Sequence, residues 1–310
     1  MTGDERKQTM EVGQKPATLT TAPRTGQLSQ ERYRLWYRKA FNGFMTGLLT
    51  SLMVISVAIL FIIVLNIVEN GIGVINLGFF IHVHKPAGVS GGGIAQAIVG
   101  TLIMLGIASA VSVPLGILVA VFLVEFGGGW FAELVRFAVD LMLQMPSIVV
   151  GIFVWSLLVR QVTGFAGIAG AISLMVIMTP IVIRSVEEIL RLVPDLIREA
   201  GLALGLPHWR VVISVVIPTV RSGIITGVIL AMARAAGETA PLLLTALGND
   251  FLSTDLSQPM AAIPLQIYNY ATQPSAELNQ KAWGAALVLI FVIAVFSAAA
   301  RMFSGRMKHG

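Results

Sequence analysis

Two opposite charges interrupt an otherwise apolar run in the C-terminal third of this 310-residue chain. Arg234 and Glu238 lie four residues apart in the string ARAAGETAP, so a helix would place both side chains on one face, close enough to pair. Guanidinium presents a planar fork of N–H donors that matches phosphate oxygens, and it stays charged at physiological pH. A carboxylate would accept a hydrogen bond from phosphate, which keeps an O–H near neutral pH, but would repel sulfate. We therefore predict an oxyanion pathway at Arg234, Glu238 and the adjacent Thr239.

The same pair of charges has a structural interpretation that the residues leave open. Arg234 and Glu238 could neutralise each other and fix the packing of their helix against a neighbouring subunit, since such pairs persist without adding much stability. Pro241 lacks the N–H that the carbonyl of Gly237 would accept from, which should loosen the helix beside the charges.

The elements that position these charges are apolar enough to lie in lipid. The chain is 56% hydrophobic and only 12% charged, with a mean hydropathy of +0.84. Crossing the hydrocarbon core of a bilayer takes a helix of about 20 residues. Six runs are long enough, at residues 44–68, 94–124, 134–159, 165–183, 215–247 and 283–303. We predict an all-α membrane protein with six transmembrane helices, in which the longer runs tilt, kink at Pro114 or extend beyond the membrane.

The positive charges predict how the chain is oriented, because loops rich in Lys and Arg stay in the cytoplasm. Five such residues between positions 24 and 39 place the N-terminus inside, and six crossings return the C-terminus to the same side. The segment 184–210 also falls inside and holds four arginines. Residues 1–43 read as a polar, largely disordered cytoplasmic tail, and residues 44–310 as the transmembrane domain.

Two further charged positions are candidates with structural alternatives. Arg184, at the inner end of the fourth run, could line the same pathway, although many arginines at this depth extend to lipid phosphates instead. Asp140 is interpreted as an interfacial carboxylate paired with Arg136, four residues before it. No metal site is predicted, because cysteine is absent and the neighbours His82 and His84 have no third ligand.

The inner segment between the fourth and fifth runs is too long for a simple connection. Its pattern predicts two short helices separated at Gly205, where glycine permits a sharp turn, with Pro207 beginning the second. An apolar ridge at near-helical spacing is formed by Leu196, Ala200, Ala203 and Leu204. The ridge indicates either an interfacial helix lying on the membrane or a docking element for a soluble partner.

This segment resembles the EAA signature of bacterial ABC importer permeases, E-A-A-x3-G-x9-I-x-L-P. Glu199, Gly205 and Pro218 occupy its first, seventh and twentieth places, whereas Gly201 and Val215 replace the usual Ala and Ile. The resemblance implies that residues 187–218 form a coupling loop that docks an ATPase subunit. The residues to which it assigns that contact are Glu199, Ala200, Gly205, Leu206 and Pro207.

Three further strings, at residues 91–126, 140–153 and 233–246, resemble the phosphate-specific ABC importer permeases of the PstA type. The resemblance covers residues 44–303, and GETAPLL is its most specific part, since the sister PstC type usually continues differently after R-A-x-G-E-T. It implies a MetI-like permease core over residues 94–303 and, from the string TPIVIRSVEE, places Arg184 near the inner gate.

The same resemblance implies the partners. A PstC-like permease subunit would supply the other half of the pathway, a dimer of PstB-like ATPase the energy, and a PstS-like protein the phosphate, all at a bacterial inner membrane. The chain contains no G-x4-G-K-[ST] string, so we expect it to bind no cofactor and the partner ATPase to use ATP. Nucleic acid is not an expected partner, because the basic residues form no basic face.

Two other functions remain open on the residues alone. The EAA loop says nothing about cargo, so the same fold could import another oxyanion such as molybdate or sulfate. A less favoured alternative is an intramembrane enzyme that uses Arg234 and Glu238 on lipid phosphates. No catalytic residues are assigned, since neither H-E-x-x-H nor G-x-S-x-G occurs in the sequence.

Overall fold

The computed structural model describes residues 25–89 and 91–306, which form helices and connecting loops. The described residues fall into two units that divide between Ile62 and Ile63. Helix α1 (Thr25–Gly71) supplies the described part of the first unit. It begins earlier than expected, because residues 25–43, predicted as disordered tail, are helical. The string QLSQERYRLWYRK (27–39) holds no proline or glycine to stop a helix. Residues 1–24 of the predicted tail lie outside the described residues.

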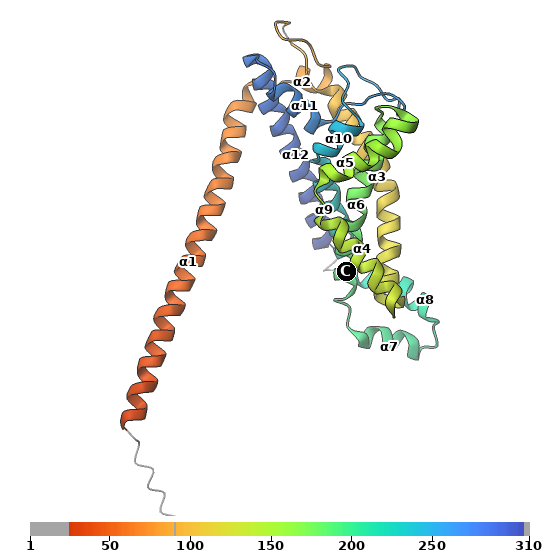
Figure 1. Ribbon diagram of the computed structural model, residues 1–310. Helices are drawn as coiled ribbons and strands as arrows, with labels where there is room; N and C mark the ends of the chain where they lie inside the picture. The colour runs from red at the N-terminus through yellow and green to blue at the C-terminus, as the bar shows by residue number, and fades with distance from the viewer. Residues whose placement is uncertain (1–24, 90, 307–310) are drawn as a thin grey trace, which may run out of the picture. The chain divides into compact units, whose positions relative to one another are not determined.

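The second unit is a bundle of long helices joined by short ones (Figure 1). Its α-helices are α2 (Leu77–Ile81), α3 (Ala95–Val121), α4 (Trp130–Gln144), α5 (Ser147–Val154), α6 (Gly167–Leu190), α7 (Asp195–Ala203), α8 (His208–Val211), α9 (Ile217–Ala236), α10 (Ala240–Thr245), α11 (Ile263–Ala271) and α12 (Ala276–Arg306). A 3-10 turn, η1 (Ile72–Val74), and three π-helical segments, η2 (Phe122–Phe126), η3 (Trp155–Thr163) and η4 (Val212–Val216), complete it. Helices α7 and α8 lie at one end, here the α7 end, and α2 and α11 at the other, the α2 end (Figure 1).

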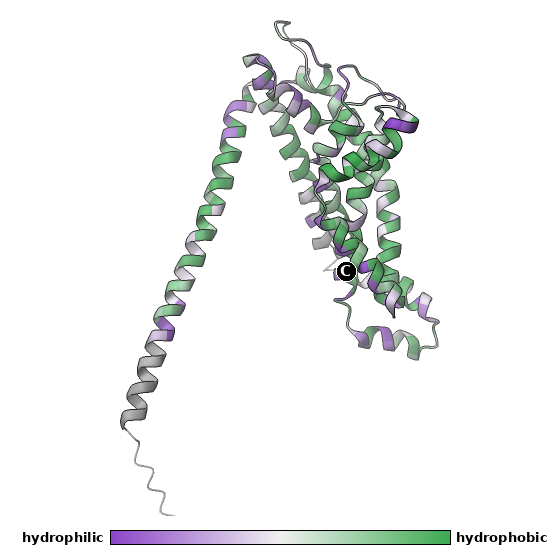
Figure 2. Ribbon diagram, in the orientation of Figure 1, coloured by the Kyte–Doolittle hydropathy of each residue, from purple (hydrophilic) through white to green (hydrophobic). Residues whose placement is uncertain are grey.

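Within residues 25–89 and 91–306, five helices are long and apolar enough to cross a membrane (Figure 2). They are Tyr37–Val74, Ala95–Phe126, Gly167–Leu190, His208–Ala236 and Ala276–Ala299. The predicted number of six is reached if the pair Trp130–Gln144 and Ser147–Thr163 counts as one further span. Pro114 lies inside the continuous helix α3.

Two of the predicted spans have the wrong form. The run 134–159 is bent by 102° between α4 and α5, because Pro146 cannot continue a helix and holds the preceding Met145 in an extended conformation. The run 215–247 is wrong at both ends. The fifth span begins at His208, since the π-helical η4 carries the helical path into α9, and it ends at Ala236.

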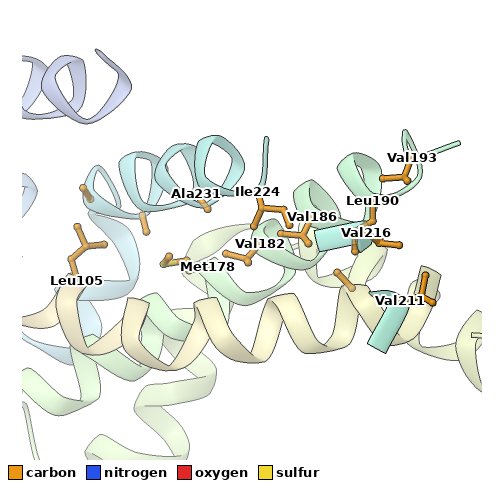
Figure 3. Packing of buried hydrophobic residues seen from close by; sticks show 13 residues of the cluster. Leu105, Met178, Val182, Val186, Leu190, Val193, Val211, Val216, Ile224 and Ala231 are labelled. Carbon is orange, nitrogen blue, oxygen red and sulfur yellow. The ribbon is translucent and has the colours of Figure 1, made fainter. Parts of the chain in front are cut away.

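The largest core cluster lies where α6 packs between α3 and α9 (Figure 3). Leu105 from α3, Met178 and Val182 from α6, and Ala231 from α9 are buried together. Small residues let the backbones approach, as membrane helices require. A Cβ on Gly116 of α3 would lie 2.6 Å from Cγ1 of Val182. The cluster continues to the α7 end through residues of the connecting segments, among them Val193, Val211 and Val216.

Candidate functional site

The charged string of α9 opens onto a pocket of about 320 Å³. Five structural pieces form its wall: the end of α4, the bend after it, α5, α6 and the end of α9 with the residue Glu238 beyond it. The lining residues are Met142, Leu143, Gln144, Met145, Pro146, Ser147, Val150, Ile177, Ile181, Arg234 and Glu238. The two predicted charges therefore share one pocket.

The pocket lies where two interrupted helices meet. The bend between α4 and α5 contributes Met145 and Pro146, and the break between α9 and α10 contributes Glu238. Pro241 occupies the first turn of α10, a position that needs no N–H donor. Broken helices in a membrane occur where the freed backbone lines a cavity, which fits the position of both breaks.

The break corrects the expected geometry of the two charges. Arg234 lies in the last turn of α9, whereas Glu238 lies beyond Gly237, the residue that ends the helix, so the two do not share a helical face. Among the described residues no ion pair joins them, and Arg234 is exposed while Glu238 is half-buried. The prediction that they could pair as helical neighbours was wrong, because a continued helix would bring the Pro241 ring against the carbonyl of Gly237.

Two polar residues of the wall were missed by the sequence analysis. Gln144 ends α4 and Ser147 begins α5, one on each side of the bend, and both line the pocket. Their signal in the sequence was a pair of polar residues flanking Met145 and Pro146 within an apolar run. An amide, a hydroxyl, a guanidinium and a carboxylate together offer donors and acceptors that suit a partly protonated tetrahedral oxyanion.

The other predicted pathway residues lie elsewhere. Thr239 precedes α10 and is half-buried, but it is not part of the pocket wall. Arg184 lies near the α7 end of α6, where its Nη1 is 3.4 Å from Oε2 of Glu187 and its Nε is 3.1 Å from Oε1 of Glu188. The structure therefore separates Arg184 from the pocket that holds Arg234.

A buried carboxylate organises the charges around Arg184. The side chain of Glu187 is 1% exposed and accepts from Nε of Arg136 at 3.0 Å and from Nη2 of Arg191 at 2.6 Å. Arg136 thus reaches from α4 to α6, and the predicted pair of Arg136 with Asp140 was wrong. A carboxylate removed from water needs charged partners far more than one at an interface does.

The loop at the α7 end has the predicted form. Helices α7 and α8 are separated at Gly205, whose φ of +78° is a left-handed conformation that favours glycine, and Pro207 directly precedes α8. The apolar ridge faces outward, with Leu196 76% and Leu204 82% exposed. The residues assigned to ATPase docking are exposed or half-buried: Glu199, Ala200, Gly205, Leu206 and Pro207.

Packing under the ridge explains one departure from the EAA signature. Gly201 is buried, and a Cβ there would lie 2.9 Å from Cγ1 of Val211 in α8. The usual alanine at this place would require the Val211 side chain, or α8 with it, to shift. The pairing of Gly201 with Val211 therefore fixes how closely the two short helices pack.

A second ion pair fastens the loop to the bundle and was also missed. Arg198 of α7 donates from Nε and Nη2 to the carboxylate of Glu125 in η2, at 2.9 to 3.2 Å. Hydrogen bonding to Glu125 raises the pKa of Arg198 above its ordinary value. Nothing in the spacing of the sequence links the two residues, which are 73 positions apart.

Residues 112–309 match the family model described as "Binding-protein-dependent transport system inner membrane component". A Yersinia pestis protein named "Phosphate transport system permease protein PstA" is 39% identical over 282 residues, which cover 91% of this chain and 95% of that protein.

Two solved structures share the fold at low sequence identity. The MetNI methionine ABC transporter, in an inward-facing conformation, aligns with a TM-score of 0.56 and 17% identity, over 69% of this chain and 95% of that one. A bacterial alginate ABC transporter, in complex with an alginate-pentasaccharide-bound periplasmic protein, aligns with a TM-score of 0.60 and 14% identity, over 89% of this chain and 99% of that one.

Proposed function

Because this chain belongs to the family of binding-protein-dependent transport system inner membrane components, we propose that it forms half of the translocation pathway of an ATP-driven phosphate importer. The predicted all-α, MetI-like permease fold is confirmed by the two solved structures. The chain is a multi-pass inner-membrane transport subunit, so the alternative of an intramembrane enzyme is set aside.

The observation that carries the choice of phosphate is the shared pocket of Arg234 and Glu238, in a chain with a PstA relative at 39% identity. Arg234 would bind the oxyanion through its donor fork, and Glu238 would accept the O–H that phosphate keeps near neutral pH. Gln144 and Ser147 extend the set of hydrogen-bonding groups. Thr239 and Arg184 are proposed as further residues of the pathway, Arg184 at its inner gate.

The remaining subunits follow from the same assignment. A PstC-like permease would face this chain across the pathway, a PstB-like ATPase dimer would dock on α7 and its ridge, and a PstS-like protein would deliver phosphate from outside. The α7 end would then be cytoplasmic, in agreement with the four arginines of segment 184–210, and the positive charges near both ends of the sequence would make both termini cytoplasmic as well. ATP would be used by the ATPase dimer, with no cofactor bound by this chain.

Uptake in reconstituted vesicles tests the proposal. The chain is purified with its copurifying subunits and placed in proteoliposomes. ATP is supplied on the side of the membrane that carries the ATPase, and radiolabelled inorganic phosphate with phosphate-binding protein on the opposite side. We expect phosphate uptake that depends on ATP and that excess molybdate or sulfate does not inhibit. Uptake of molybdate or sulfate in place of phosphate would support the alternative cargo.

A matched pair of variants tests the pocket itself. Arg234→Gln keeps much of the side chain but removes the charge, and we expect uptake to fall by at least tenfold at unchanged amounts of assembled transporter. Arg160→Gln removes an exposed arginine of η3 that does not line the pocket, and should transport like the wild type. Equal uptake by both variants would contradict a role for Arg234 in the pathway.

A further inference from the structure

Arg198 joins three parts of the α7 end through its guanidinium. It donates to the carboxylate of Glu125 in η2, to the carbonyls of Leu190 and Val193 at the end of α6, and to Asp195 in its own helix. The Glu125 side chain is 2% exposed, whereas that of Asp195 is 89% exposed. The ion pair of Arg198 with Glu125 is therefore the buried connection between α7 and the bundle. Solvent and salt screen it less than the exposed ion pair of Arg198 with Asp195.

Segment η2, which Arg198 contacts through Glu125, is also contacted by a second arginine. Nη2 of Arg136, on α4, donates to the carbonyl of Leu123 in η2, while its Nε donates to the buried Glu187 of α6. Both arginines thus converge on the five residues of η2. A displacement of α7 would be carried through Glu125 to η2, and from η2 to α4, through charge-assisted hydrogen bonds at each step.

Helix α4 then extends from this grip to the pocket. Arg136 lies eight residues before Gln144, which corresponds to about 12 Å along a helix axis. The last residues of α4 form part of the pocket wall, and the 102° bend follows directly. A helix fixed at one part and ending at a sharp bend can swing its other end without unfolding, as hinged elements do.

We propose that the series α7, Arg198, Glu125, η2, Arg136 and α4 transmits movement of the ATPase-docking loop to the wall of the oxyanion pocket. Arg198 and Arg136 are positioning residues in this series, since neither lines the pocket. The inference rests on the proposed function for the identity of the driving subunit. It adds the route by which that subunit would change the pocket at the end of α4.

The experiment separates coupling from assembly. Wild-type and Glu125→Gln transporters are reconstituted with their ATPase, and phosphate uptake and ATP hydrolysis are measured in the same vesicles. Gln keeps the size of Glu125 and can still accept one hydrogen bond from Arg198, so the loop stays folded. We expect ATP hydrolysis within about twofold of the wild type and phosphate imported per ATP to fall by at least fivefold. Arg198→Lys keeps the charge but loses the planar fork of donors. Its phosphate imported per ATP should lie between the values of the wild type and of Glu125→Gln.

A distance measurement tests the movement without any cargo. The chain has no cysteine, so Phe137→Cys on α4 and Phe291→Cys on α12, both exposed, give this chain two defined positions for spin labels, which are attached before the other subunits are added. Adding ATP with vanadate to the assembled transporter should shift the distance between the labels, and Glu125→Gln should abolish that shift. A wild type that imports no phosphate but shows the shift would overturn the proposed function and leave this route standing.

The matched control is Asp195→Asn, which removes the exposed partner of Arg198 and leaves the contact with Glu125. It should behave like the wild type in both measurements. The route is overturned if Glu125→Gln shows the wild-type shift in label distance, or if its uptake and ATP hydrolysis fall in the same proportion. It is also overturned if Asp195→Asn uncouples transport as strongly as Glu125→Gln does.

Discussion

A Cβ atom on Gly151 of α5 would lie only 2.7 Å from the Cα of Pro241 in α10. The two short helices therefore meet backbone to backbone at the point where both interrupted segments reach the pocket. Gly151 follows the bend after α4, and Pro241 follows the break after α9. This contact fixes the two breaks against each other, and so fixes the pocket that carries Arg234 and Glu238.

Gly151→Ala should disturb the pocket without unfolding the chain. The added methyl cannot fit at 2.7 Å from a backbone atom, so α10 must shift by several tenths of an ångström or more. We expect a loss of about 1 to 3 kcal/mol in stability and a clear reduction in phosphate uptake. Gly106→Ala in α3 is the control, because a Cβ there has nothing within 4 Å. Equal uptake by the two variants would show that the contact is not needed.

Arg234→Lys separates charge from geometry. Lysine keeps the positive charge but loses the planar fork that matches two oxygens of an oxyanion. Loss of one charge-assisted hydrogen bond is worth about 1.5 to 3 kcal/mol, which corresponds to about a tenfold or greater reduction in apparent affinity for phosphate. The measurement is the concentration dependence of phosphate uptake in proteoliposomes. Wild-type affinity in the lysine variant would mean that charge alone is sufficient.

Glu238→Gln tests discrimination between oxyanions. The amide removes the negative charge that would repel sulfate, while it can still accept a hydrogen bond from phosphate. We expect sulfate to compete with phosphate uptake in the variant and not in the wild type. Unchanged phosphate uptake together with unchanged exclusion of sulfate would refute the selectivity role of this carboxylate.

Gly205→Ala should weaken attachment of the ATPase. A residue with a Cβ is strained at a φ of +78°, by about 1 to 2 kcal/mol, so the turn between α7 and α8 would rearrange. The readout is the amount of ATPase that copurifies in mild detergent, which we expect to decrease severalfold. Gly128→Ala is the control, because Gly128 lies in a loop with open space around it and has no positive φ. This variant should retain the ATPase.

The burial of Tyr270 predicts that the folded protein loses stability at alkaline pH. Burial raises its pKa from 10.0 to about 12, while the hydroxyl donates to the carbonyl of Gly93 and lies 3.0 Å from Nδ1 of His84. The folded state thus retains the proton between pH 10 and pH 12, where the unfolded state loses it. The contribution of the buried Tyr270 hydroxyl to the free energy of unfolding is complete below pH 10. As pH rises through 12 this contribution is lost, and the free energy of unfolding falls by roughly 3 kcal/mol.

Thermal unfolding of the detergent-solubilised protein between pH 9 and pH 11.5 measures this effect. The midpoint should fall with rising pH above 10 in the wild type. Tyr270→Phe lowers stability at neutral pH but should show a smaller alkaline decline, because it has no proton to lose at this position. An equal alkaline decline in both proteins would assign it to other groups.

The sequence was most informative where a local pattern decides the structure. Apolar length located the membrane helices, and glycine and proline placed the turn at Gly205. Local reasoning failed where a helix is interrupted. Pro146 lies in an apolar run, and hydropathy does not report where a helix changes direction. Pro241 did indicate a weakened helix beside the charges, but not that α9 would end at Gly237.

The sequence by itself determined that this chain is a bundle of membrane helices, with an EAA loop and two charges in an apolar run. Those properties depend on composition and on the spacing of residues along the sequence. Only the tertiary structure decided that Arg234 and Glu238 face one pocket from either side of a helix end, and that Glu187 and Glu125 hold Arg136 and Arg198. Such contacts join residues far apart in the chain, and a buried carboxylate takes whichever cation the packing brings within reach.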